Sequence, residues 1–248
     1  MNPTSKPQTD LFAVTRWSVV LAAGDSALGA RGETALAELC QAYWFPVYAY
    51  LRRKGHGKPE AEDLAQGFFA QLLEKQSYAV ADPERGRFRA FLITALKNFL
   101  HNAWDREQRI RRGGGQPLIE LDTVTGEDRY ALTATDVPPD VAFDREWAQT
   151  VVTTALERLR QEYVAAGRLP LFDHLQNGIA NPTRQLSQAD LASQLGMTEI
   201  AVKSAMQRLR KRYRHLLLAE IAQTTTTPDE VEAEIRHLLD CRRASPEA

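Results

Sequence analysis

The chain is 248 residues long, with 31 basic residues against 32 acidic ones, so its formal net charge at pH 7 is −1. This length suggests two domains, and 44% hydrophobic with 25% charged residues is typical of a globular protein rather than a disordered one. No apolar run is long enough to cross a membrane, and the polar segment Met1–Asp10 lacks the apolar core of a signal peptide. The two cysteines form no metal-binding pattern, which favours a reduced, cytoplasmic protein.

The near-zero average hides a segregation of charge along the chain. Residues 85–112 carry eight basic side chains against two acidic ones, and residues 203–214 carry six basic side chains and no acid. Residues 113–146 carry eight acids against two arginines, and the last thirty residues carry seven acids against three arginines. Basic clusters are the electrostatic footprint of a protein that binds phosphate backbones, although a solvated helix face is the alternative explanation.

In chain order, the hydrophobic periodicity predicts helices almost throughout and no strand. Residues 1–32 form an N-terminal leader with one short helix over 13–23. Pro46 predicts a kink or break in the first long helix, and residues 77–87 read as a turn-rich loop. The helices predicted for this first domain, residues 33–112, span 33–54, 59–75 and 88–112.

Three consecutive glycines then open an acidic, proline-containing linker over residues 113–142. The second helical domain covers residues 143–218. It is predicted to begin with a long helix to about Ala166 and a short helix over 169–176, followed by a loop that contains Gly178 and Pro182. Residues 219–248 form a C-terminal extension with an amphipathic helix over 228–240.

The most specific local pattern lies between Leu186 and Leu216. Ser187 and Thr198 are placed to cap two successive helices, and Gly196 can supply the positive φ of the turn between them. This is the layout of a DNA-binding helix-turn-helix, and its basic second helix favours that interpretation over an ordinary helical hairpin. The buried side of the second helix is predicted to hold Ile200, Ala201, Val202, Ala205, Leu209 and Tyr213.

Two blocks of the chain, in this order, resemble the sigma-70 family of bacterial RNA polymerase initiation factors, in particular its extracytoplasmic-function (ECF) type. Residues 36–112 are similar to sigma region 2 through AEDLAQGFFAQLLEK and RFRAFLITALKNFLHN, and residues 147–218 are similar to sigma region 4 through LASQLGMTEIAVKSAMQRLRKRY. The resemblance implies an all-α protein with two small helical domains on a flexible linker. It also implies a transcription initiation factor that is not an enzyme and needs no cofactor or metal.

The partners implied by the resemblance are bacterial core RNA polymerase, through its β′ clamp and β flap, and promoter DNA. An anti-sigma factor is a further partner class, and the free protein is expected to be a monomer that does not insert into membranes. The helix over residues 61–75 would dock on the clamp coiled coil of the polymerase, with Phe68 in the core of the domain. The contacts implied there are Asp63, Gln66, Phe69 and Glu74.

The helix over residues 88–112 would face the −10 promoter element. Asn98 and Asn102 lie four residues apart, hence on one helix face, and match positions that read the exposed non-template strand. A flipped base would enter a pocket beside the loop at residues 82–88, where Phe88 and Trp104 are candidate stacking partners. The side chains assigned to the −10 element are Phe88, Lys97, Asn98, His101, Asn102, Arg106, Arg109, Arg111 and Arg112.

The second helix of the helix-turn-helix pattern would bind the −35 element as duplex DNA. Glutamine and arginine can read base edges there, while lysine and serine mainly grip phosphates. Because the C-terminal extension is acidic, a tail that folds back over this helix is a further hypothesis. The side chains assigned to the −35 element are Thr198, Lys203, Ser204, Gln207, Arg208, Lys211 and Arg212.

Two other classes of protein compete with the sigma factor interpretation. A conventional helix-turn-helix regulator would use residues 1–112 as a sensory or dimerisation domain and form a tight dimer, but it leaves the basic third helix unexplained. An enzyme is disfavoured because the five histidines are scattered and no HExxH, P-loop or GxSxG pattern occurs.

Overall fold

The computed structural model describes residues 29–74, 88–109, 130, 137–180, 187–225 and 227–243. Regular structure in these ranges is entirely helical, which confirms the all-α prediction. The chain divides into two compact units: unit 1 comprises residues up to Thr150 together with those from Ile221 onward, and unit 2 comprises Val151–Glu220. None of the described helices is long and apolar enough to span a membrane.

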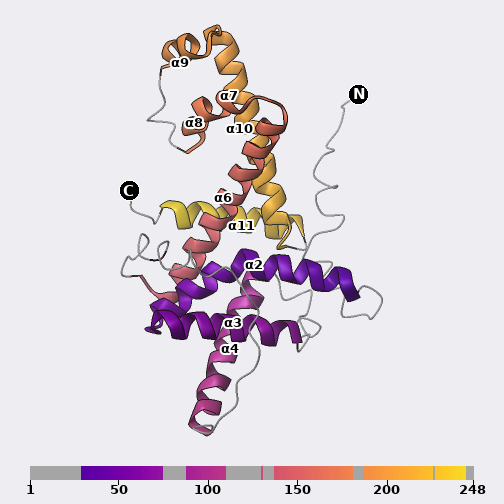
Figure 1. Cartoon of the computed structure of the whole chain (residues 1–248), viewed down its shortest axis with the longest axis vertical. Coiled ribbons are helices and arrows are strands. Elements are labelled where there is room, and N and C mark those ends of the chain that lie inside the picture. The colour runs from indigo at the N-terminus through magenta and orange to yellow at the C-terminus, as the bar shows by residue number, and fades with distance from the viewer. Residues whose placement is uncertain are drawn as a thin grey trace. The chain divides into compact units, whose positions relative to one another are not determined.

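Unit 1 is built around three helices from the first half of the chain. Figure 1 shows α2 and α3 side by side, with α4 running across them. The beginning of α6 and the C-terminal helix α11 complete this unit. The bounds are α2 Gly29–Arg53, α3 Lys58–Glu74, α4 Phe88–Arg109, α6 Pro139–Ala165 and α11 Pro228–Arg243.

Helix α2 continues through Pro46, so of the predicted kink or break at this residue the break is wrong. Pro46 removes one backbone hydrogen bond from the helix. The residues on both sides of it, among them Trp44, Val47 and Tyr48, are buried against the rest of unit 1. Tertiary packing on both sides of Pro46 therefore holds the helix together at a position where its local sequence disfavours it.

Aromatic side chains join the helices of unit 1 into one core. The Tyr43 ring lies edge-on to Phe88 of α4, with 5.0 Å between centroids, and stacks on Phe143 of α6 at 6.2 Å. Phe68 of α3 meets Phe99 of α4 at 5.6 Å, as expected of a core residue. Pairs of this geometry contribute stabilisation beyond their buried area. The core thus links α2, α3 and α4 with a helix that begins 30 residues after α4 ends.

The linker is shorter than the predicted range 113–142, because α6 begins at Pro139 and Ala142 is buried. Residues 139–142 are therefore helix and not linker. The remainder of the linker lies outside the described residues, except for residues 137–138 and for Tyr130, whose ring packs edge-on against Tyr48 and beneath Arg52. The predicted helix over residues 13–23 and the loop over 77–87 also lie outside them. The predicted tail helix is confirmed as α11.

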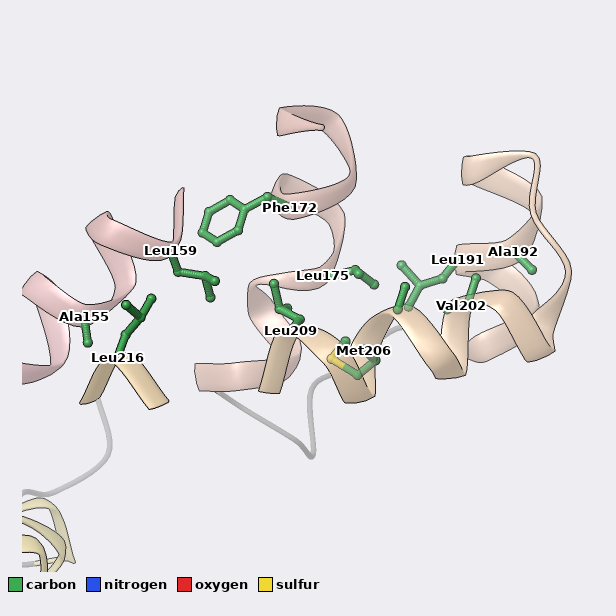
Figure 2. Packing of buried hydrophobic residues seen from close by; sticks show 11 residues of the cluster. Ala155, Leu159, Phe172, Leu175, Leu191, Ala192, Val202, Met206, Leu209 and Leu216 are labelled. Carbon is green, nitrogen blue, oxygen red and sulfur yellow. The ribbon is translucent and has the colours of Figure 1, made fainter. Parts of the chain in front are cut away.

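Unit 2 packs short helices against the long helix α10. Figure 2 shows buried side chains of α6, α7 and α9, among them Leu159, Phe172 and Leu191, lined up along α10. The predicted loop around Gly178 is instead a short helix, whose Gly178 carbonyl accepts a hydrogen bond from Arg210 at 3.1 Å. The helices of this unit that follow α6 are α7 Leu169–Leu175, α8 Asn177–Ala180, α9 Gln188–Leu195 and α10 Glu199–Ala222.

The turn between α9 and α10 has the capping geometry that the sequence predicts. The Ser187 hydroxyl accepts a hydrogen bond from the Asp190 amide at 3.1 Å, and the Thr198 hydroxyl accepts one from the Ala201 amide at 3.2 Å. Gly196 ends α9 with φ +60°, a conformation that costs a residue with a side chain about 1–2 kcal/mol. One part of the prediction is wrong: Ile200 is 80% exposed, and Met206 is buried on the inner face instead.

Replacing Gly196 by alanine is expected to lower the free energy of unfolding of unit 2 by about 1 kcal/mol, because alanine does not adopt a positive φ without strain. Urea unfolding followed by circular dichroism measures the change. Gly57→Ala is the matched control, since a methyl group there meets open space and the backbone conformation is ordinary. Equal losses in the two variants would contradict the assignment of strain to the turn.

Candidate nucleic-acid interface

Helix α4 has an exposed polar face and a buried charged face. Asn98, His101 and Asn102 lie three and four residues apart on one side of the helix, and all three are exposed. Arg89 lies nine residues before Asn98, which is two and a half turns, so it projects from the opposite side. The structure therefore brings three of the predicted −10 residues together on one open surface, called the front face of α4 below.

A cavity of about 450 Å³ opens beside this front face, at the end of α2, the start of α3 and the middle of α4. Its apolar lining includes Leu64 and Leu100. Glu60 is the one acidic side chain in the lining, and its carboxylate lies 2.8 Å from Nδ1 of His56. The basic side chains in the lining are Lys54, His56, Lys97 and His101. An apolar lining with a basic rim suits a nucleotide, which presents an aromatic base and a phosphate.

Lys97 is held by an acidic residue of the first turn of α6. Its ammonium nitrogen lies 2.7 Å from Oδ1 of Asp140, and both side chains are exposed. The hydrogen bond from Lys97 to Asp140 raises the pKa of Lys97, which keeps the lysine charged. Exposed ion pairs are worth at most about 1 kcal/mol, so a phosphate could replace the carboxylate at small cost.

Two predicted contact residues are core residues instead. Phe88 is 0% exposed and packs on Tyr43, and Phe69 is 2% exposed and packs on Phe68, so neither aromatic ring is presented to a partner. Phe88 is therefore not placed to stack on a base, and Phe69 is not placed to contact the polymerase. Asp63 is exposed and Gln66 half-buried, as a surface role requires. The side chains outside the described part of the structure are those of Glu74, Trp104, Arg106, Arg109, Arg111 and Arg112.

The buried face of α4 is organised around Arg89. Its Nε and Nη2 donate to the two carboxylate oxygens of Glu234 in α11, each at 3.2 Å, and its Nη1 donates to Asp144 in α6. The guanidinium also lies over the Trp147 ring, 5.1 Å from its centroid. Nε2 of His237 lies 3.1 Å from the second oxygen of Asp144. The acidic tail is therefore bonded to α4.

The charges of this cluster support one another. Burial disfavours a charged Arg89, but the carboxylates of Glu234 and Asp144 outweigh burial and raise its pKa. Burial likewise opposes charge on Asp144, yet the bond from His237 and the charge of Arg89 lower its pKa. The hydrogen bond to Asp144 raises the pKa of His237 to about 9, so this imidazole is protonated at neutral pH.

In unit 2, the exposed side of α10 carries most of the predicted −35 residues. Lys203, Gln207 and Lys211 recur every four residues on one face and are exposed, with Ser204 half-buried beside them. Arg208 is also exposed, at the margin of this face. Ile200 continues the face toward the start of the helix, and its apolar side chain is of the kind that contacts the methyl group of thymine.

Two predicted −35 residues have structural partners. Arg212 donates through Nε to Oε2 of Glu162 at 2.8 Å and through Nη2 to the other oxygen, so its guanidinium is engaged with α6. This bond lowers the pKa of Glu162 and keeps the pair charged. The Thr198 hydroxyl caps α10. Both residues therefore have structural roles. A contact from Arg212 to DNA would require its ion pair with Glu162 to open.

Sequence reasoning missed several residues of these surfaces. Lys54 and His56 follow directly on the basic end of α2, and this short basic run is a signal in the sequence that could have found them. Glu234, which binds Arg89, is 145 residues away along the chain, and no local sequence pattern predicts such a pair. Ile200 was assigned to the core because the helical period alone allows it there.

Together the two units present polar, basic helix faces of the kind that nucleic-acid-binding proteins use. Residues 39–110 match the family model of Sigma-70 region 2. This match covers a segment of unit 1 and supports a relation of the chain to the sigma-70 family. Searches of curated proteins and of solved structures give no match to the chain.

The protonated His237 predicts how stability depends on pH. A group whose pKa is raised by folding, here from 6.5 to about 9, stabilises the folded state fully below pH 6.5 and loses this contribution as the pH rises through 9. After allowance for solvent screening at a side chain that is 31% exposed, we expect about 1–2 kcal/mol to be lost over this range.

Urea unfolding between pH 6 and pH 10 measures this loss, and His237→Gln is expected to remove it. The groups that face His237 are Asp144, Arg89 and Cys241. The change of the free energy of unfolding with pH therefore reports on this cluster. His174→Gln, at an exposed position in unit 2, is the control. The same pH slope in wild type and His237→Gln would show that His237 does not carry the effect.

Proposed function

We propose that the protein is an ECF-type sigma factor, which binds core RNA polymerase and directs promoter recognition and opening. The observation that carries this proposal is the exposed row of Asn98, His101 and Asn102 on α4, within the segment that matches Sigma-70 region 2. Amide and imidazole groups can both donate to and accept from base edges. The row therefore suits the reading of unpaired bases of the −10 element.

The cavity beside this row gives the opened strand a place to bind. Bases pulled from the duplex cost a few kcal/mol each, and a site that traps one offsets this cost. The apolar lining at Leu64 and Leu100 would receive the base, and Lys54 and Lys97 would bind the adjacent phosphates. We propose this cavity as the strand-trapping site, in place of the pocket that was predicted beside Phe88.

We propose that α9 and α10 form a helix-turn-helix that binds the −35 element as duplex DNA, within a region 4-like domain that corresponds to unit 2, Val151–Glu220. The expected start of this domain at residue 143 is too early, because Phe143 packs on Tyr43 and Trp147 lies beneath Arg89 in unit 1. Lys203, Gln207, Arg208 and Lys211 are exposed on α10 and would contact base edges and phosphates. The capped turn at Gly196 supports this proposal, because it holds the two helices in a defined relation. Residues 33–112 would form the region 2-like domain.

The remaining partners follow from the same proposal. Asp63 and Gln66 on α3 are the described side chains that would meet the β′ clamp of the polymerase, and the region 4-like domain would meet the β flap. An anti-sigma factor is a further candidate partner. We propose that the protein works in the cytoplasm, as a monomer when free, without a cofactor and without catalysing a reaction.

Transcription by bacterial core polymerase tests the function. Templates with a randomised upstream region, transcribed with and without the protein and then sequenced, would identify the promoters that depend on it. On a selected promoter, the double variant Asn98→Ala/Asn102→Ala is expected to reduce open-complex formation more than tenfold, because two base-reading amides are lost. Its affinity for the −35 duplex is expected to remain that of the wild type.

Thr94→Ala on the same helix is the matched control, because Thr94 is exposed and its hydroxyl bonds only to the backbone of Ala90 among the described contacts. Permanganate footprinting of unpaired thymines measures opening directly. A protein that binds duplex DNA but neither binds polymerase nor opens any template would contradict the proposal, and would instead be a conventional helix-turn-helix regulator.

The pair between Lys97 and Asp140 predicts a variant with stronger DNA binding. Asp140→Asn releases Lys97 for a phosphate, so affinity for single-stranded −10 DNA is expected to rise about two- to fivefold at low salt. The affinity should also fall more steeply with salt, by about 0.7 in the logarithmic slope for one added contact. Fluorescence anisotropy measures both quantities. Asp140→Glu, which keeps the charge, is the control, and an unchanged affinity in Asp140→Asn would exclude Lys97 as a phosphate ligand.

A further inference from the structure

The C-terminal segment is attached to the first turn of α4 at two points. The Phe88 amide, at the start of α4, donates to the Thr224 carbonyl at 3.0 Å. One residue later, Arg89 binds both carboxylate oxygens of Glu234 and one oxygen of Asp144. A guanidinium is needed for this arrangement, since its three nitrogens reach three oxygens in fixed directions.

The Arg89 contacts are partly buried, since the Arg89 side chain is 14% exposed, whereas the groups of the C-terminal segment that meet α4 are buried. The Glu234 side chain is 1% exposed, and Thr224 and Thr225 are buried as well. Separation of α11 from α4 would leave a charged arginine and a charged glutamate without their partners, which is strongly unfavourable. Val231 and Leu238 bury the apolar side of α11 in the same unit.

None of these contacts lies on the front face of α4, and each of them ties the start of α4 to another part of unit 1. The cavity beside the front face has walls from α2, α3 and α4, so its width depends on how α4 lies against the other two helices. Arg89 holds α4 from the opposite side, through residues of α6 and α11. A small rotation or shift of α4 would move Lys97 and His101 relative to Lys54 and His56.

We propose that Arg89, Asp144 and Glu234 are positioning residues for capture of the −10 strand, with α11 acting as a clasp that holds α4 in the binding orientation. This inference rests on the proposed function. It gives the C-terminal extension a role in −10 recognition, although it lies more than a hundred residues after α4 in the sequence. Arg89, although part of the basic cluster of residues 85–112, acts inside the protein and does not contact phosphate.

The variant Glu234→Gln in the full-length chain tests this inference, because it removes one charge and keeps the shape of the side chain. We expect binding of a single-stranded −10 oligonucleotide to weaken about tenfold. Binding of the −35 duplex is expected to stay unchanged, because its residues lie in unit 2. The matched control is Glu232→Gln, two residues earlier on α11, whose carboxylate pairs only with exposed Arg236 among the described contacts.

Thermal unfolding and circular dichroism, recorded beside each binding curve, separate positioning from folding. A folded Glu234→Gln protein with a lower Tm and unchanged strand binding would overturn the inference, and α11 would then be a structural helix only. If Glu234→Gln does not fold, Arg89→Lys carries the test, because it keeps the positive charge but cannot reach all three carboxylate oxygens. Normal strand binding by Arg89→Lys would likewise overturn the inference.

The wild-type protein distinguishes the two levels of proposal. If wild type does not bind the −10 oligonucleotide or polymerase, the proposed function itself fails. If wild type binds both, and Glu234→Gln binds the oligonucleotide as well as wild type does, only the clasp fails.

Discussion

Unit 1 depends on the pairing of one partly buried arginine with carboxylates from two distant parts of the chain. The Arg89 side chain is only 14% exposed, and Glu234 and Asp144 compensate its charge by binding all three of its nitrogens. The same pairing allows Glu234 to be buried, and Asp144 in turn binds His237. Removal of one member leaves the others uncompensated, so α4, α6 and α11 stay together or separate together.

This dependence explains the charge pattern of the sequence. The acidic segments around the basic cluster at residues 85–112 are not merely a solubilising balance, because Asp140, Asp144 and Glu234 each bind a basic side chain of α4. These ion pairs differ in how exposed their side chains are. Arg89 is neutralised inside the protein, whereas the Lys97 pair is exposed and can exchange its carboxylate for a phosphate. Helix α4 thus packs one face inside unit 1 and leaves exposed the face that we propose for the −10 strand.

Local sequence patterns predicted the elements well, because caps, glycine stops and helical periods act over a few residues. Ser187, Gly196 and Thr198 have the predicted roles, and Asn98 and Asn102 share an exposed face as predicted. The errors arise where packing overrides the local signal. Pro46 remains inside α2, Phe69 and Phe88 are buried although a surface role was assigned to them, and Ile200 is exposed although its period allows burial.

The sequence by itself determined that the chain is helical, where the capped turn between α9 and α10 lies, and which segments are basic, since each of these depends on neighbouring residues. Only the tertiary structure decided which charges remain available to a partner. Arg89 and Arg212 are taken up by carboxylates 145 and 50 residues away, while Lys203 and Lys211 stay exposed. A net charge of −1 is a sum over the whole chain and carries no information about pairing. Pairing depends on distances that exist only once the chain has folded.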